Sequence, residues 1–344
     1  MKHIGKSYDK VDAKGILSGK PSYTGDFVPK DALIIKVLRS PHAQAKIKSI
    51  DTSKAKLIPG VEAIFTYEDV PNTRFTLAGQ TYPEPSAYDA LILDPVVRYV
   101  GDEVALVVAK DEATALKAMP LIKVEYEVQK PVLDLRTAMD HETVVHPEDD
   151  ILNHIPVGQD YKRNICVSYH KRVGDIEGEL AKCDYVVEGT YFDQATRQSA
   201  MEPFQSFGYI DHLGRIVIVS STQIVFHVRR HIARALGIPA SKIRVIKPRI
   251  GGGFGSKQTA CTELMTAFVT WKLQKPCYLL YDRTEAQTCS TTRHAREWYI
   301  RVGATKDGII QVIDMDSITD AGAHATHCFT TTTAGEHKSV PLYN

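Results

Sequence analysis

The chain has 344 residues, of which 43% are hydrophobic and 24% are charged, and its formal net charge at pH 7 is +1. This length exceeds the usual size of one domain and predicts two, each burying its own core. A charge this close to zero gives no electrostatic case for a nucleic acid or an anionic membrane surface as partner.

The first part of the chain alternates short apolar runs with one helical stretch. Residues 111–119 suit a helix that Asp111 caps. The runs typical of strands are residues 33–38, 60–65, 104–109 and 122–126. Residues 134–162 carry prolines and acids with weak periodicity, which indicates a long surface connection. The pattern predicts an α+β fold with domains at residues 1–150 and 151–344.

Two strand-turn-helix units are predicted in the second part. Strand 215–220 leads into a helix that Gly237 ends, and strand 243–250 leads through a glycine turn into a helix with Leu264, Phe268 and Trp271 on one face. Ligands favour such turns. The remaining strands are expected at residues 185–191, 277–281, 296–304 and 309–318, the last two forming a hairpin through the turn 306–308.

Membrane and secretion signals are absent from the sequence pattern. The longest apolar run, residues 104–109, is far too short to cross a bilayer. The basic residues at the start are not followed by an apolar stretch, so no secretory signal is predicted and a cytoplasmic protein is expected. The six cysteines show no paired spacing, which favours reduced thiols over disulfides or an iron–sulfur cluster.

The segment from Pro248 to Lys257 is the sharpest motif. Four glycines in five positions after a strand let the backbone approach a ligand closely. A Walker loop requires adjacent Gly and Lys, and the dinucleotide fingerprint requires a glycine at position 256, but Ser256 stands there. The alternative that remains is a tight turn that packs strand on helix.

Several motifs together resemble the molybdenum-binding subunits of the xanthine dehydrogenase and aldehyde oxidase family, in the same order and spacing. The resemblance covers essentially the whole chain, and it is greatest to the N-terminal part of the bacterial xanthine dehydrogenase type. The motifs are residues 220–223, 244–245 and 251–258, with 39–43, 97–105, 201–203, 292–294 and 320–323.

The resemblance implies an α/β hammerhead domain at residues 1–150 and the first part of a mixed α/β molybdopterin-binding domain at 151–344. Gln223 would hydrogen-bond near the metal through its amide, as a second-shell contact to molybdenum. Phe254 and Gly255 would offer backbone amides to the molybdenum centre, in a cofactor-binding loop with Gly253.

The implied activity is hydroxylation of a purine-like N-heterocycle, such as xanthine or hypoxanthine, with water as the oxygen source. Electrons would pass to an iron–sulfur subunit and an FAD subunit. Gln258 stands where mammalian-type enzymes carry a substrate-facing glutamate, so it is the predicted substrate contact, and it weakens the case for xanthine itself.

The catalytic base of the family is expected beyond Asn344, in the remaining molybdopterin region, so no catalytic residue is assigned and the chain alone is expected to be inactive. The alternatives are a catalytically silent scaffold of such a complex, or a hydroxylase of another heterocycle, such as nicotinate, or of an aldehyde.

Other charged residues are given less specific roles. Glu202 is either an acceptor near the site or a carboxylate paired with an arginine. His294, His324 and His327 are not assigned as metal ligands. The acidic pair at residues 102–103 is expected in an exposed turn, and the basic cluster at residues 229–234 is expected on a solvated helix face.

Overall fold

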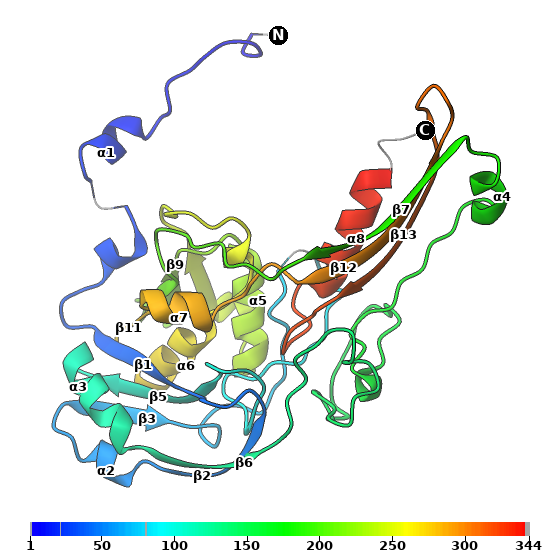
Figure 1. The fold of residues 1–344 in the computed structure, drawn as a ribbon. Helices are drawn as coiled ribbons and strands as arrows, with labels where there is room; N and C mark the ends of the chain where they lie inside the picture. The colour runs from blue at the N-terminus through cyan, green and yellow to red at the C-terminus, as the bar shows by residue number, and fades with distance from the viewer. Residues whose placement is uncertain (1, 21, 80, 341–344) are drawn as a thin grey trace.

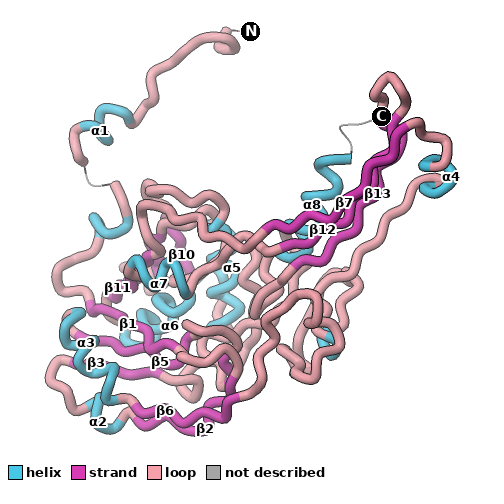
Figure 2. The backbone as a smooth tube through the Cα atoms, in the orientation of Figure 1, coloured by secondary structure: helices cyan, strands magenta, loops and turns pink. Residues whose placement is uncertain are grey.

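A computed structural model describes residues 2–20, 22–79 and 81–340, and its main body is built on a mixed sheet (Figures 1 and 2). The sheet has seven strands. In spatial order they are β10 (Ile243–Ile246), β9 (Ile216–Ser220), β8 (Gln205–Ile210), β11 (Cys277–Leu280), β1 (Leu33–Arg39), β5 (Glu103–Ala109) and β3 (Val61–Phe65).

Strands from both predicted domains share this sheet. β1 pairs in parallel with β11, where Leu33 lies opposite Cys277, and antiparallel with β5 on its other side. The domain boundary near residue 150 stays a prediction, because residues on both sides of it contribute strands to one sheet. No helix or strand lies between Val128 and Tyr161, as expected for that connection.

Two smaller sheets flank the main one. The first holds β7 (Tyr185–Asp193), β12 (Arg296–Ala304) and β13 (Ile310–Thr319) and extends away from the main body as a long arm (Figure 1). β12 and β13 form the predicted hairpin. The second holds β4 (Val96–Val97), β2 (Ala45–Asp51) and β6 (Lys123–Val128).

Both faces of β5 are buried, which explains its continuous apolar run. Leu106 and Val108 join the core beneath α5 (Val225–Leu236) and α6 (Glu263–Leu273). Val107 joins the core on the opposite face with α2 (Ser53–Lys56) and α3 (Glu112–Ala118). Asp111 caps α3 as predicted, since its side chain accepts a hydrogen bond from the Thr114 amide at 2.8 Å. A strand covered on both sides needs no polar alternation.

The remaining helices are short, apart from α8. They are α1 (Ala13–Leu17), α4 (Ile176–Leu180), α7 (Arg283–Thr288) and α8 (Cys328–Ser339), with 3-10 turns η1 (Thr24–Phe27), η2 (Met119–Leu121), η3 (Tyr161–Arg163), η4 (Ala240–Lys242) and η5 (Ser256–Gln258). In the part of the chain that the structure describes, no helix is long and apolar enough to cross a membrane.

The second strand-turn-helix unit differs from its prediction. β10 ends at Ile246, and α6 begins at Glu263, so η5 and a loop separate the glycine turn from the helix. The apolar residues of α6 do not form a single face, because every residue from Glu263 to Thr270 is buried. The helix packs between β8, β9, β11 and α5, and a helix enclosed on all sides loses its amphipathic pattern.

The basic cluster on α5 is a solvated face only in part, since Arg234 is exposed but Arg230 and His231 turn toward Glu84. Arg230 Nη2 lies 2.8 Å from Glu84 Oε1, and Arg234 packs over the Tyr88 ring. His231 is only 4% exposed. These side chains hold the segment around residues 82–90 against α5, because a buried carboxylate needs cationic partners.

Asp102 and Glu103 are also not in an exposed turn. Asp102 is buried and accepts hydrogen bonds from the Arg98 and Glu103 amides, at 2.7 and 3.0 Å. Glu103 pairs with Arg39 at 2.8 Å and accepts from the Tyr99 hydroxyl at 3.2 Å. The expectation failed because β5 begins at Glu103 and carries this pair into the core.

Acid should weaken the contact between Glu84 and α5. Burial acts to raise the pKa of Glu84, but the nearby His231 ring and the hydrogen bonds from Arg230 and Tyr88 outweigh burial and place the pKa well below its ordinary value of 4.5. The stability that this carboxylate contributes is therefore present above that value and lost as pH falls below it. We expect Glu84→Gln to destabilise the protein clearly at pH 6 and less at pH 3.5, measured by denaturant unfolding. An equal difference at both pH values would contradict this.

Candidate functional site

Gln223 and the glycine turn come together at one edge of the main sheet. β9 and β10 pair in parallel, with Val219 opposite Ile246, so the segments that follow both strands leave the sheet on the same side. The backbone amide of Gln223 donates to the Lys257 carbonyl at 2.8 Å. Gln223 Oε1 accepts from the Gly255 amide at 3.2 Å, which leaves its NH2 group to donate elsewhere.

The loop keeps its backbone open where Gln223 crosses it. A Cβ atom at Gly253 would lie 2.6 Å from Gln223 Oε1, so any other residue there would displace this side chain. Gly255 has φ +92°, and a Cβ atom there would meet nothing within 4 Å. The Phe254 ring is 75% exposed, and the residue has φ +49°. The conformation presents backbone and an aromatic ring to the outside.

The Glu202 carboxylate holds the glycine loop in place through a hydrogen bond and an ion pair. Its Oε2 accepts from the Gly251 amide at 2.7 Å and from Lys257 Nζ at 2.8 Å. Its Oε1 accepts from Gln205 at 2.8 Å. The Lys257 side chain is 2% exposed and the Glu202 side chain 9%. Of the two roles left open for Glu202, the structure shows an ion pair, but with a lysine instead of an arginine.

Glu263 supports the turn that carries Gln223, and the sequence pattern did not reveal it. Its Oε1 accepts from the Ser220 hydroxyl at 2.6 Å, and its Oε2 accepts from the Cys261 and Thr262 amides. Burial raises the pKa of Glu263, although these hydrogen bonds act to lower it. The available sequence signal was an acidic residue in the first turn of a helix, which usually marks only a favourable helix dipole.

Gln258 lies at the end of η5, on the far side of the glycine turn from β10. Its amide donates to the Gly255 carbonyl at 3.1 Å, and its own carbonyl oxygen lies 3.0 Å from His327 Nε2. The contact between the Gln258 side chain and substrate stays a prediction. His294 has its Nδ1 2.8 Å from the Asp320 carbonyl.

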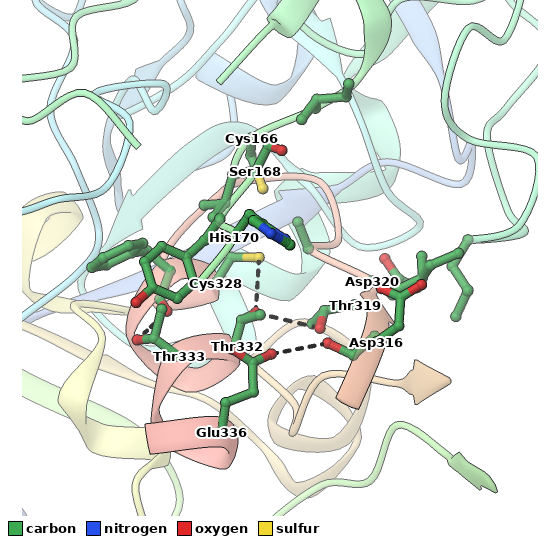
Figure 3. A pocket seen from close by; sticks show the side chains of 18 of the residues that line it. Cys166, Ser168, His170, Asp316, Thr319, Asp320, Cys328, Thr332, Thr333 and Glu336 are labelled. Carbon is green, nitrogen blue, oxygen red and sulfur yellow. Dashed lines mark hydrogen bonds between the residues drawn. The ribbon is translucent and has the colours of Figure 1, made fainter. Parts of the chain in front are cut away.

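A large groove lies elsewhere in the described part of the chain. It encloses about 1580 Å³ between the segment around Cys166, strand β13 and helix α8 (Figure 3). Among its lining residues, the Thr332 hydroxyl donates a hydrogen bond to the Thr319 hydroxyl at 3.3 Å, and the Ser317 hydroxyl donates one to Glu336 Oε1 at 3.2 Å. Gln223 and residues 253–255 are not among its lining residues. The loop with the predicted cofactor contacts is thus an open edge of the sheet, separate from this groove.

Comparison with known families identifies the chain. The model of a molybdopterin cofactor-binding domain matches residues 157–344, more than half of the chain. The model of the aldehyde oxidase and xanthine dehydrogenase a/b hammerhead domain matches residues 18–130. The chain belongs to the aldehyde oxidase and xanthine dehydrogenase family. The resemblance and the expected fold class, a hammerhead domain followed by a molybdopterin-binding domain, are confirmed.

Relatives of this family member include several molybdenum enzymes. The chain is 38% identical to the probable hypoxanthine oxidase XdhD of Escherichia coli K12, over 99% of the chain and 38% of that protein. It is 31% identical to the nicotinate dehydrogenase large molybdopterin subunit of Eubacterium barkeri, over 94% of the chain and 72% of that protein. The chain therefore spans well under half the length of the first relative.

Solved structures of the family share the fold. The aldehyde oxidoreductase of Desulfovibrio gigas matches with a TM-score of 0.77 and 25% identity, over 92% of this chain and 34% of that one. The CO dehydrogenase of Oligotropha carboxidovorans matches with a TM-score of 0.75 and 29% identity, over 91% and 39%. Both superpositions include most of the hammerhead and molybdopterin-binding parts of this family member.

The glycine loop of this family member fits a large cofactor on chemical grounds. Open space lies where a side chain at Gly255 would project, and a Cβ atom at Gly253 would displace the Gln223 side chain. Gln223 adds an NH2 donor beside the loop, and Phe254 adds an exposed apolar wall. Backbone, amide and ring together form a surface that a flat, polar cofactor can approach closely.

Proposed function

We propose that this chain forms part of the molybdenum-cofactor site of a hydroxylase that oxidises a purine-like N-heterocycle, such as hypoxanthine or xanthine. The observation that carries the proposal is the placement of Gln223 against the Gly253–Gly255 turn, at the edge of a sheet in a molybdopterin-binding domain. The 38% identity to a probable hypoxanthine oxidase supports the substrate class.

Each residue of the site would have a defined part. Gln223 would donate its NH2 group to the cofactor, with its orientation set by the Gly255 amide. Phe254 would limit access of water with its exposed ring, and Gln258 would donate to or accept from a heterocycle edge. When bound, the molybdenum cofactor supplies two-electron oxidation with oxygen from water. We propose no residue of this chain as the catalytic base.

Partner subunits complete the proposal. An iron–sulfur subunit and an FAD subunit would take the electrons, and a further molybdopterin-binding region would cover the open loop, in a complex that works in the cytoplasm. Residues 1–150 would serve as the hammerhead domain and residues 151–344 as the first part of the cofactor domain. Six cysteines, all free and widely spaced in the sequence, are consistent with clusters carried elsewhere.

A second substrate class has its own support. This chain covers 72% of the length of the nicotinate dehydrogenase large molybdopterin subunit of Eubacterium barkeri. Nicotinate is also an electron-poor N-heterocycle but carries a carboxylate, so a cation near the substrate would favour it over a purine. An aldehyde stays a third candidate through the aldehyde oxidoreductase fold match.

The test is a substrate panel on the complex purified from its source cells. We expect molybdenum by elemental analysis and oxidation of hypoxanthine or xanthine with incorporation of oxygen from labelled water. Faster oxidation of nicotinate or an aldehyde would replace the substrate class and keep the family chemistry. A complex without molybdenum, prepared beside a fully loaded control hydroxylase, would favour the catalytically silent scaffold instead.

A further inference from the structure

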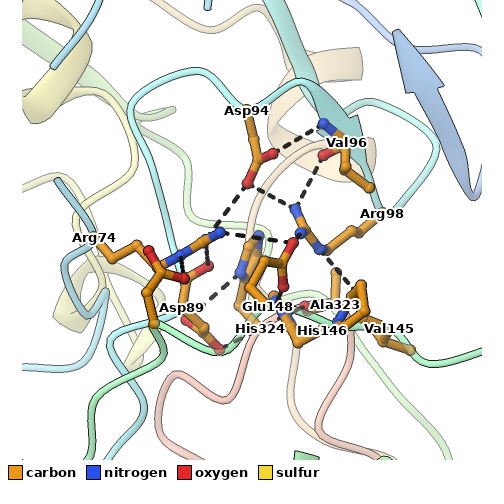
Figure 4. A network of polar contacts seen from close by, with 12 residues as sticks. Arg74, Asp89, Asp94, Val96, Arg98, Val145, His146, Glu148, Ala323 and His324 are labelled. Atoms are coloured by element: carbon orange, nitrogen blue, oxygen red, sulfur yellow. Dashed lines mark hydrogen bonds and ion pairs between the residues drawn. The ribbon is translucent and has the colours of Figure 1, made fainter. Parts of the chain in front are cut away.

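A second cluster of metal-ligating side chains lies outside the glycine loop. Asp89, His146 and His324 each offer one ligand atom, and these three atoms lie within 4.8 Å of one another (Figure 4). The side chains are 2%, 9% and 16% exposed. They come from three distant parts of the chain: the segment before β4, the long connection after β6, and the turn before α8. The fold therefore assembles this cluster only once all three segments are in place.

Four buried atoms, three in the cluster and one in the neighbouring Glu148, have no hydrogen-bond partner among the described residues. They are Asp89 Oδ1, His324 Nδ1, His146 Nδ1 and Glu148 Oε2. A buried polar atom without a partner costs free energy, so a concentration of four points to an absent ligand. The His146 Nδ1 faces Glu148 Oε2 at 3.6 Å, while its Nε2 lies 2.7 Å from the Ala323 carbonyl and 3.9 Å from Asp89 Oδ2. Ligating histidines commonly make this kind of bond through their other nitrogen.

The spacing of these atoms suits a small divalent cation. Asp89 Oδ1 lies 3.6 Å from His324 Nδ1, and His146 Nδ1 lies 3.6 Å from Glu148 Oε2. Two ligands at zinc's usual bond length of about 2.0–2.1 Å are roughly 3.4 Å apart in a tetrahedron. Each of these two pairs would reach that value with slight closure, and the ligand atoms of Asp89, His146 and His324 lie within 4.8 Å of one another. Asp89 and His146 also line the groove of Figure 3, which gives an ion a path to the site.

The local charge favours a cation as well. Among the described residues, Asp89, Asp94, Glu148 and Asp150 face the two guanidinium groups of Arg74 and Arg98, so negative charges are in excess when the histidines are neutral. Both arginines are engaged with Asp94 and Glu148. The other oxygen of the Asp89 carboxylate accepts a hydrogen bond from the Ala325 backbone amide at 2.7 Å.

A similar set of residues elsewhere also has unpartnered buried atoms, at both ring nitrogens of His231, but it already holds a guanidinium group. Glu84, His227 and His231 also lie within ligand distance of one another. There, however, Arg230 Nη2 lies 2.8 Å from Glu84 Oε1 and 2.7 Å from His227 Nδ1, so a guanidinium group already occupies the position of a metal ion. This second cluster is an internal control of matched composition.

We propose that Asp89, His146 and His324 bind one divalent cation of the zinc type, separate from the molybdenum cofactor. Two imidazoles and one carboxylate are a ligand set that zinc favours, and a water or Glu148 would complete four-coordination. The ion would join the long connection to the turn before α8. This proposal does not depend on the molybdenum chemistry.

The test is zinc binding by the purified 344-residue chain after chelator treatment. We expect one equivalent of Zn²⁺ to bind in competition with a chromophoric chelator, to raise the melting temperature, and to be replaceable by Co²⁺ with a visible absorption band. Asp89→Asn and His324→Ala should weaken Zn²⁺ binding by about 100-fold, since loss of a direct ligand costs at least as much as loss of its supporting contacts.

His227→Ala is the matched control and should leave zinc affinity unchanged. Circular dichroism of each metal-free variant shows whether it is folded, and Asp89→Asn keeps the side-chain shape and an oxygen for the Ala325 amide. Failure of the folded wild-type chain to bind Zn²⁺ would overturn the proposal and make the cluster an ion-pair network with a protonated histidine. Zinc binding that survives in both ligand variants, or is lost only in His227→Ala, would overturn it equally.

Discussion

Replacing Lys257 with methionine should lower the free energy of unfolding by about 3–5 kcal/mol. The substitution keeps most of the apolar volume but leaves the Glu202 carboxylate buried without its cation, and breaking a buried pair on one side costs this much. The loss should appear as a lower denaturant midpoint in unfolding followed by circular dichroism. Because Glu202 also binds the Gly251 amide, the glycine loop should loosen with it.

Two controls separate the buried charge from a general effect of the substitution. Lys130→Met removes the cation of an exposed pair with Glu142, both about two-thirds exposed, and should change stability by no more than about 0.5 kcal/mol. Adding Glu202→Gln to Lys257→Met removes the unpaired charge and should restore part of the loss. A Lys257→Met protein as stable as Lys130→Met would contradict the role of this pair.

Gly253→Ala should lower turnover of the complete enzyme by about 100-fold with little loss of stability. The new Cβ atom would lie 2.6 Å from Gln223 Oε1, which is the end of a flexible side chain and can move aside. The fold would therefore tolerate the methyl group, but Gln223 would leave its position beside the loop. A displacement of about 1 Å at a catalytic site is enough for a loss of this size.

The matched control is Gly15→Ala, in helix α1, where the nearest atom to the new Cβ would be Lys20 Cδ at 3.7 Å. It should leave both turnover and melting temperature unchanged. Turnover, molybdenum content and melting temperature are measured on each variant. Wild-type turnover in Gly253→Ala would show that the position of Gln223 does not matter, whereas a large drop in melting temperature would show that the loop is structural.

Much of the fold follows from local patterns in the sequence. β1, β5 and the hairpin of β12 and β13 lie close to their predicted ranges because apolar runs bounded by turn residues are local signals. β8 was missed, since the run Gln205–Ile210 mixes polar and apolar residues that are all at least partly buried. α8 was missed as well, because its run of threonines has low helix propensity and only tertiary packing can stabilise it.

The candidate site divides in the same way. Gln223 and the glycine turn could be found from their motifs, and the structure brings them into contact. The residues that support them, Glu202, Lys257 and Glu263, are ordinary charged residues in the sequence and gain a role only through burial. The cluster of Asp89, His146 and His324 was not predicted at all, because its members share no spacing and meet only through tertiary structure.

The place of β1 in the main sheet has a consequence for synthesis of the protein. Leu33 pairs with Cys277, so β1 cannot pair with its parallel neighbour β11 until the chain up to β11 has left the ribosome. Contacts between residues so distant in sequence form slowly, and an unpaired strand edge invites association with other chains meanwhile. The hammerhead part, translated first, thus has one edge exposed in nascent chains, and chaperone binding during translation should concentrate on that edge.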